Sequence, residues 1–322
     1  MSRVQTMAKR IVRRNIERYR ASAFSAVVNQ VRNTYDSLVI ENRQNKNRDL
    51  LREMHRGILA TSPLSCNPDA RCELHTLTAH HHVCMYLTAL KSLLVHFDDV
   101  AVVTHDDGSL TREDNALLTA HIDGIRIIPK PDADKAMAPI LEGYPRAAAL
   151  RARVVNALEL FDNILLARTE KLINMNSDVL FFAPPEALID WVVRDSRYIT
   201  GVFEAEPAEQ KAFLKAQGSR FSPHITTALT CFYRSVMDLE TVERILEDTR
   251  PGWFTAQNLF PLLYEQHEET HRSLYFDEDA YQASGNFDTA PVFRHYWTST
   301  GFFTELQTND SERIIRSLGK AN

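Results

Sequence analysis

Residues 171–191, KLINMNSDVLFFAPPEALIDW, hold three consecutive polar residues inside a mainly apolar run. Asn176, Ser177 and Asp178 interrupt a stretch that is otherwise typical of a buried strand. Core strands seldom carry such groups unless each has a hydrogen-bond partner or binds a ligand. Because alternate side chains of a strand point to one side, Asn176 and Asp178 present oxygen acceptors together. Such oxygens suit Mn²⁺ or Mg²⁺, and capping of local backbone groups at a strand end is the alternative.

The segments around this stretch alternate between strand and helix. Strands are expected at residues 72–78, 99–105, 124–130 and 170–182, and helices at 80–97, 111–122 and 145–167. This alternation predicts an α/β fold with a mostly parallel central sheet flanked by helices. Ligands in such sheets bind at the carboxyl ends of the strands. Farther on, residues 224–236 are expected to form a strand that enters a helix, and residues 237–249 and 255–267 to be helical.

The N-terminal part of the chain is basic. Residues 1–60 hold thirteen Lys or Arg and five Asp or Glu, although the 322-residue chain has a net charge of −5. Apolar residues recur at helical spacing in residues 1–20, which predicts an amphipathic helix on an anionic membrane surface. A helix that packs on the main domain or on another subunit is the alternative. The acidic remainder argues against nucleic acid as a partner.

Composition predicts a cytoplasmic protein, peripheral to the membrane if residues 1–20 bind it. No apolar run approaches the ~18–20 residues that span a bilayer, and the N-terminus lacks the apolar core of a secretory signal. The four cysteines, Cys66, Cys72, Cys84 and Cys231, include no CxxC pair, which favours free thiols. Zinc is the alternative, at spacings that match no common zinc motif. The linker at residues 61–70 divides the chain into a basic helical segment, residues 1–70, and a second domain, residues 71–322.

The order of elements and the string NMNSDVLFFAPPEALIDW resemble the GT-A-fold glycosyltransferases, which transfer a sugar from a nucleotide-sugar. The resemblance spans about residues 72–305 and includes ELHTLTAHHHVCMYLTALKSL and VVTHDDGSLT. In that family the corresponding stretch commonly reads L-D-S-D-V-L-F-F and is the DXD motif. The resemblance implies that Asp178 is the principal acidic ligand of a divalent cation at the donor diphosphate. Asn176 replaces the first Asp: it keeps an acceptor for ribose hydroxyls but lacks the charge, which lowers the expected metal affinity.

The same resemblance suggests two further positions. His295 and Tyr296 match the start of an H-Y-x-G pattern in which His binds the metal, although Thr298 stands where Gly is usual. A structural His among aromatic residues is the alternative. Ala256 and Gln257 stand where inverting members often place a carboxylate base, and Gln cannot act as a base. The residues therefore do not distinguish a retaining from an inverting mechanism.

Nucleotide-sugar contacts are implied at strand ends and on one helix. Thr76 and Thr78 end the first strand, where nucleobases often bind in this fold. Asp107 follows the second strand, with an ordinary turn at Asp107–Gly108 as the alternative. Arg153 lies on the helix before the N-S-D stretch and is expected to reach a phosphate, with a solvated side chain as the alternative. Residues 80–82, three histidines, are expected at the surface, because successive rings fan around a helix.

These observations predict a GT-A-like glycosyltransferase of the hexosyltransferase type. The implied partners are a UDP- or GDP-sugar donor and a glycan, lipid-linked or other acceptor, and the implied cofactor is Mn²⁺ or Mg²⁺. A catalytically impaired GT-A-fold binding or scaffold protein is one alternative, because Asn176, Ala256 and Thr298 depart from the family pattern. A nucleotidyltransferase is another, and the absence of a Gly-rich phosphate loop near the first strand argues against it.

Overall fold

The computed structural model describes residues 52–194, 199–204, 208–219, 224–249, 252, 255–266, 274–283, 291–296 and 305–319. The chain divides into two compact units, Met1–Arg52 and Glu53–Asn322. The predicted amphipathic helix at residues 1–20 lies outside the described residues and stays a prediction. Across the described ranges, no helix is long and apolar enough to cross a membrane.

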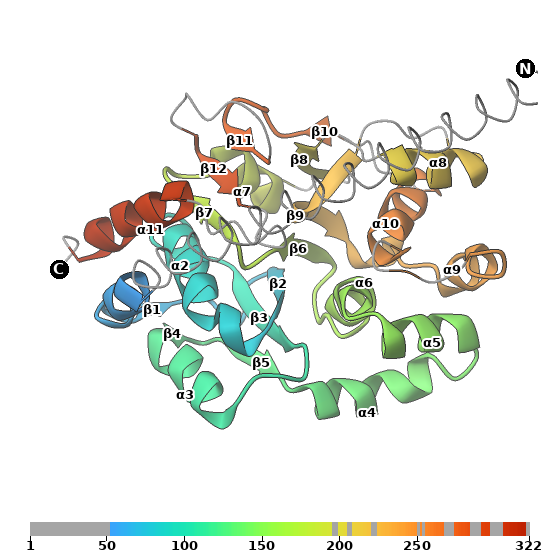
Figure 1. Cartoon of the computed structure of the whole chain (residues 1–322), viewed down its shortest axis with the longest axis horizontal. Coiled ribbons are helices and arrows are strands. Elements are labelled where there is room, and N and C mark those ends of the chain that lie inside the picture. Colours follow the sequence, from blue (N-terminus) through green and yellow to red (C-terminus); the bar gives the residue numbers. More distant parts are fainter. Residues whose placement is uncertain are drawn as a thin grey trace, which may run out of the picture. The chain divides into compact units, whose positions relative to one another are not determined.

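A seven-stranded sheet forms the centre of the second unit (Figure 1), in the order β10-β8-β9-β6-β2-β3-β5. The strands β2, β3, β5 and β6 are parallel, and β9 runs antiparallel between β6 and β8. The expected mostly parallel α/β sheet is therefore confirmed. The strand bounds are β2 (Cys72–Thr78), β3 (Ala101–Asp106), β5 (Arg126–Ile128), β6 (Lys171–Met175), β8 (Thr200–Glu204), β9 (His224–Tyr233) and β10 (Leu274–Tyr275).

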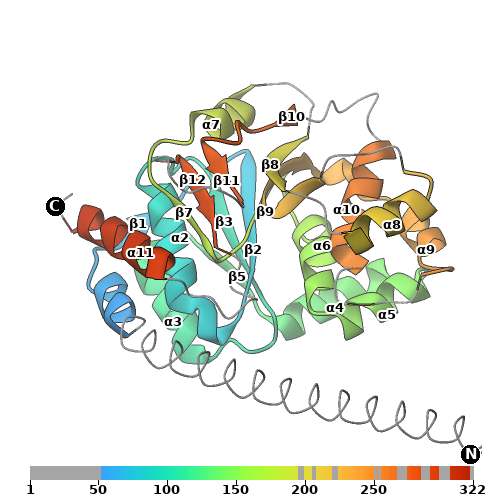
Figure 2. The same cartoon turned by 45° about the horizontal axis from the view of Figure 1, so that its top comes forward.

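Helices lie on both faces of this sheet (Figure 2). Successive residues of β6 pack in two different hydrophobic cores, one on each face of the sheet. Ile173 lies in the core that includes residues of α2, α7 and α11. Leu172 lies in the core that includes residues of α6 and α10. Two short 3-10 helices follow β2 and β9, at His80–His82 and Arg234–Val236. Residues 52–59 are helical. The labelled α-helices are α2 (Val83–Leu94), α3 (Arg112–His121), α4 (Lys130–Ile140), α5 (Pro145–Arg153), α6 (Asn156–Leu165), α7 (Glu186–Val193), α8 (Ala208–Ala216), α9 (Leu239–Ile245), α10 (Thr255–Gln266) and α11 (Glu305–Leu318).

Two predicted elements are each divided in the structure. The helix expected at residues 145–167 is broken between α5 and α6, where Val154 adopts extended backbone angles of φ −120° and ψ 111°. Two adjacent β-branched residues, Val154 and Val155, favour such a break. The strand expected at residues 170–182 ends at Met175 and resumes as β7 (Val179–Phe181). There it leaves the large sheet and joins a three-stranded sheet, β11-β12-β7, with β11 (Tyr281–Gln282) and β12 (Phe293–His295).

Helix α4 was not expected from the sequence. It begins at Lys130 with a proline in its first turn and continues past Pro139. Proline is well accommodated in the first turn of a helix, but an internal proline usually argues against a helix. A second small element, the pair of β1 (Leu64–Ser65) with β4 (Ile122–Asp123), was also missed.

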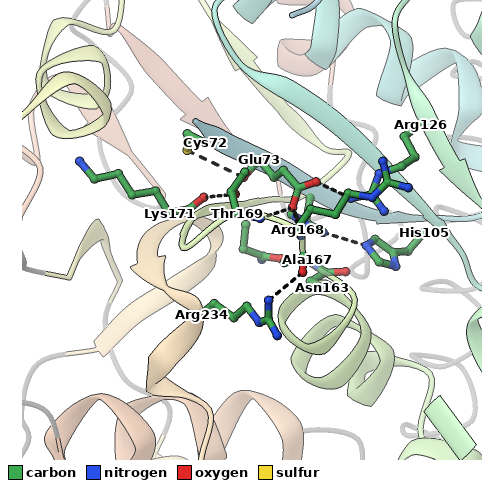
Figure 3. A network of polar contacts seen from close by, with 12 residues as sticks. Cys72, Glu73, His105, Arg126, Asn163, Ala167, Arg168, Thr169, Lys171 and Arg234 are labelled. Carbon is green, nitrogen blue, oxygen red and sulfur yellow. Dashed lines mark hydrogen bonds and ion pairs between the residues drawn. The ribbon is translucent and has the colours of Figure 1, made fainter. Parts of the chain in front are cut away.

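A buried carboxylate ties the start of β2 to the turn that precedes β6 (Figure 3). Glu73 Oε2 accepts hydrogen bonds from the backbone N–H of Arg168 at 2.6 Å and of Thr169 at 3.2 Å. Glu73 Oε1 accepts from the Arg126 guanidinium. Burial acts to raise the pKa of Glu73, but His75, the Arg168 N–H and Arg126 outweigh it and lower the pKa to about 2. The network therefore fixes the backbone at Arg168 and Thr169, directly before β6, which leads to the N-S-D stretch.

Candidate functional site

The carboxyl ends of three parallel strands meet at one edge of the sheet. β2 ends at Thr78, β3 ends at Asp106, and β6 ends at Met175, directly before the N-S-D stretch. The antiparallel strand β9 reaches this edge with its first half, where the Ala228 carbonyl accepts a hydrogen bond from the Asn176 N–H at 3.0 Å. The polar residues expected at strand ends are therefore neighbours in space, at the edge where α/β sheets bind ligands.

Asp178 and His295 are in contact at this edge. β12 pairs antiparallel with β7, which places His295 opposite Val179, and the Tyr296 N–H donates to the Asp178 carbonyl at 2.9 Å. The pairing brings His295 Nε2 to 3.3 Å from Asp178 Oδ1, and both side chains are buried. The two residues that the sequence suggested as metal ligands are thus brought together from distant parts of the chain.

Helix α6 adds a carboxylate that the sequence interpretation did not single out. Glu159 is buried, and the Asn174 Nδ2 lies 3.4 Å from its Oε1. The orientation of the Asn176 amide is assigned from its neighbours, because Glu159 Oε1 and the Thr227 carbonyl are both acceptors. In this orientation its nitrogen donates to Glu159 Oε1 at 2.8 Å and to the Thr227 carbonyl at 3.2 Å. We call Glu159, Asn176, Asp178 and His295 the strand-end cluster.

The electrostatics of Glu159 reflect this position. Burial raises the pKa of Glu159 to about 7, the hydrogen bond from Asn174 opposes the rise, and the charge of Asp178 adds to it. A sequence signal for Glu159 did exist, because it stands in the apolar run ALELF, residues 157–161. A carboxyl group there is either solvated or buried beside polar partners, and only the packing of α6 on the sheet decides between the two.

A cavity of about 410 Å³ lies at the junction of α5 and α6. Asp107 and Arg153, two predicted nucleotide-sugar contacts, both line it, as do Lys130 and Arg151. Lys130 and Arg151 are ion-paired to carboxylates, whereas Arg153 is exposed and has no ion pair among the described residues. Leu158 also lines the cavity and directly precedes the cluster carboxylate on α6. The positive lining suits an anionic ligand.

The remaining polar groups at the edge come from β2 and the turn after it. Thr76 is fully buried, and the Thr78 Oγ1 is buried with no hydrogen-bond partner in the part of the chain that the structure describes. Burial and His81 lower the pKa of His82, and Asp178 and Asp107 act in the opposite direction. His82 therefore lies near both acidic groups. His80 and His81 are exposed, as expected, and His82 is only partly so.

Gln257 lies in the first turn of α10 and is partly exposed, and the neighbouring Ala256 is buried in the core. Within the described ranges, no hydrogen bond or ion pair joins Gln257 to the strand-end cluster. Gly252, shortly before α10, lines the cavity. The Gly252 N–H donates to Thr255 Oγ1 at 2.7 Å, so the start of α10 lies near the cavity.

The cluster fits a divalent cation that also binds a diphosphate. Asp178 offers carboxylate oxygens and His295 an imidazole nitrogen, a donor set that suits Mn²⁺. Mg²⁺ is usually held by one or two carboxylates together with substrate phosphates and water, so two protein ligands would suffice. Among the described residues, no three His, Cys, Asp or Glu side chains are grouped so that they could hold a metal ion by themselves. Any cation bound here would take its remaining ligands from the substrate and water.

No family model matches the sequence, and no curated protein matches it. The structure of galactosyltransferase LgtC, in complex with donor and acceptor sugar analogs, matches with a TM-score of 0.51 at 14% identity. The match covers 77% of this chain and 95% of LgtC. This chain has the GT-A glycosyltransferase fold.

A second GT-A structure, the bifunctional glycosyltransferase WbbM, matches with a TM-score of 0.51 at 13% identity, over 78% of this chain and 51% of WbbM. The GT-A fold expected from the N-S-D stretch and its flanks is thereby confirmed. Identity at this level concerns the fold, and a fold hosts many activities. The activity of this GT-A chain must therefore be argued from its own cluster and cavity.

Proposed function

We propose that this protein is a glycosyltransferase that transfers a sugar from a UDP- or GDP-sugar to a hydroxyl of a glycan, lipid-linked or other acceptor. The observation that carries the proposal is the contact of Asp178 with His295 at the carboxyl edge of a GT-A sheet. The complex of LgtC with donor and acceptor sugar analogs supports a site for both substrates on this fold.

The proposed chemistry assigns a cation to the strand-end cluster. A bound Mn²⁺ or Mg²⁺ offsets the negative charge that develops on the diphosphate as the glycosidic bond breaks. Asp178 and His295 would hold this cation, and the Asn176 Oδ1 would accept a hydrogen bond from a ribose hydroxyl.

The cavity would bind the rest of the donor. Arg153 brings to the lining a positive charge that has no ion pair among the described residues, which suits a phosphate oxygen. The Thr78 hydroxyl offers a donor and an acceptor to the nucleoside, with Thr76 behind it in β2. Asp107 would contact the nucleotide, and Gln257 would approach the reacting sugar from the start of α10. The basic residues 1–20 would hold the enzyme at the cytoplasmic surface of an anionic membrane that carries its acceptor.

Calorimetric titration of the full chain with UDP- and GDP-sugars, with and without Mn²⁺, tests the proposal. We expect binding that depends on Mn²⁺ and is lost in Asp178→Ala and in His295→Ala. Asp190→Ala is the matched control, because Asp190 is exposed on α7 and pairs only with Arg194 among the described residues. The control is expected to bind as the wild type does.

The outcomes separate the candidate functions. Cation-dependent binding together with sugar transfer or donor hydrolysis supports a glycosyltransferase. Cation-dependent binding without either reaction supports a catalytically impaired GT-A binding protein instead. Failure to bind any nucleotide-sugar, with or without Mn²⁺, contradicts the proposal.

A further inference from the structure

The strand-end cluster contains two carboxylates, although the N-S-D stretch provides one. Asp178 comes from the turn after β6, and Glu159 comes from α6. Both are buried, and Glu159 lies within electrostatic range of Asp178 and of His295. A negative charge on Glu159 therefore acts on any ion that Asp178 and His295 hold.

Asn176 makes this arrangement possible. Its amide nitrogen donates to two acceptors, Glu159 Oε1 at 2.8 Å and the Thr227 carbonyl at 3.2 Å. An aspartate at the same position would place a carboxylate oxygen at these distances from both acceptors, with no proton to share unless one carboxyl is protonated. Like charges at such a distance are strongly disfavoured. An amide at position 176 can donate to Glu159 in its ionised form, which a cation bound nearby would favour. The Asn176 Oδ1 then lies on the side of the amide away from Glu159.

We propose that Glu159 is a positioning residue that supplies the second negative charge of the cation site and orients the Asn176 amide toward the donor. In a D-x-D sequence, position 176 would carry the second carboxylate. In this chain Glu159 of the neighbouring helix α6 carries it instead. This inference rests on the proposed function, because it requires a cation at Asp178 and His295. It predicts that position 159 and position 176 must be changed together, since an acid at one needs an amide at the other.

A swap of the two side chains tests the inference. Mn²⁺ affinity is measured on the full chain by electron paramagnetic resonance of the free ion, in the presence of UDP. The variants are Glu159→Gln, Asn176→Asp and the double variant, in which the amide introduced at position 159 can donate to the carboxylate introduced at position 176. Glu186→Gln is the matched control, since it makes the same chemical change at an exposed position of α7. Circular dichroism and urea unfolding of each variant confirm that it folds.

We expect Glu159→Gln to weaken Mn²⁺ binding by about 10–100-fold, as is usual when the partner of a metal-binding group is removed. Asn176→Asp alone is expected to bind Mn²⁺ no better than the wild type and to unfold at lower urea. The double variant recovers most of the lost affinity, and the control is unchanged. Recovery in the double variant separates this role from a merely structural one, and it remains decisive if a single variant does not fold.

Some results would overturn this inference alone, and another would overturn the proposed function as well. If the wild type binds Mn²⁺ and UDP but Glu159→Gln binds them equally well, Glu159 has no part in the site and the proposed function stands. The same holds if Asn176→Asp alone raises the affinity and the second change adds nothing. If the wild type binds neither Mn²⁺ nor UDP, the proposed function fails and the inference fails with it.

Discussion

Replacing Glu73 with Gln is expected to destabilise the protein by about 2–4 kcal/mol at pH 7. The neutral amide loses the ion pair with Arg126 and the charge that strengthens the hydrogen bonds from the Arg168 and Thr169 N–H groups. A hydrogen bond to a charged group contributes about 1.5–3 kcal/mol. The Arg126 side chain is 23% exposed, so its ion pair counts at the lower end of that range. Urea unfolding followed by circular dichroism measures the difference.

The pH dependence of this difference gives a second, independent measurement. The pKa of Glu73 in the folded protein, about 2, is below the ordinary value of 4.5. Its contribution to stability is therefore complete above about pH 4.5 and is lost as the pH falls toward 2. The gap between the two pKa values corresponds to about 3 kcal/mol. The wild type and Glu73→Gln should therefore converge in stability between pH 4.5 and 2.

A control and a refuting result complete this test. Asp190→Asn removes an ion pair whose two side chains are 59% and 66% exposed, and we expect it to cost less than about 1 kcal/mol. Equal unfolding midpoints for the wild type and Glu73→Gln would refute the view that this network supports the start of β6. A difference that stays constant from pH 5 to pH 2.5 would refute the assigned charge of Glu73.

Three further predictions concern a buried lysine, the cavity and the cation. Burial lowers the pKa of Lys91 to about 8, so unfolding experiments should show stability rising between about pH 8 and 10.5, and Lys91→Met should flatten this rise. Arg153→Ala should weaken nucleotide-sugar binding about tenfold in calorimetry, whereas Arg112→Ala, an exposed arginine of α3, should not; equal losses would argue against the cavity as the donor site. EDTA should abolish nucleotide-sugar binding yet leave the circular dichroism spectrum and the unfolding midpoint unchanged, and a drop in the midpoint would indicate a structural metal instead.

The sequence predicted those helices and strands whose apolar residues recur with a regular period. Strand and helix alternated with clear periodicity up to residue 182, and β2, β3 and β5 are found where strands were expected. The flanks of the N-S-D stretch predicted the GT-A fold correctly. The break between α5 and α6 was missed because the periodicity of apolar residues continues through Val154, while the backbone at that residue does not.

The site was partly predictable for a similar reason. Asp178 and His295 each stand in a recognisable local string, and the structure places them in contact. Glu159 stands in no such string, since its significance comes from the face of α6 that packs on the sheet and from Asn176 across that interface. The pairing of β7 with β12 could not be predicted from the sequence either. Pairing between strands that are distant in the sequence produces no periodic pattern in either strand.

The pairing of β7 with β12 has a consequence for the order of events during synthesis. Asp178 is synthesised 117 residues before His295, since 295 − 178 = 117. Their contact depends on the pairing of two strands that are far apart in the sequence. Non-local contacts of this kind form late, because the entropy of closing the loop must be overcome first. A ribosome-bound chain that ends before β12 should therefore bind UDP and Mn²⁺ no more tightly than Asp178→Ala does, and tight binding by such a chain would contradict this view. The proposed cation site would thus form only after β12 has been synthesised.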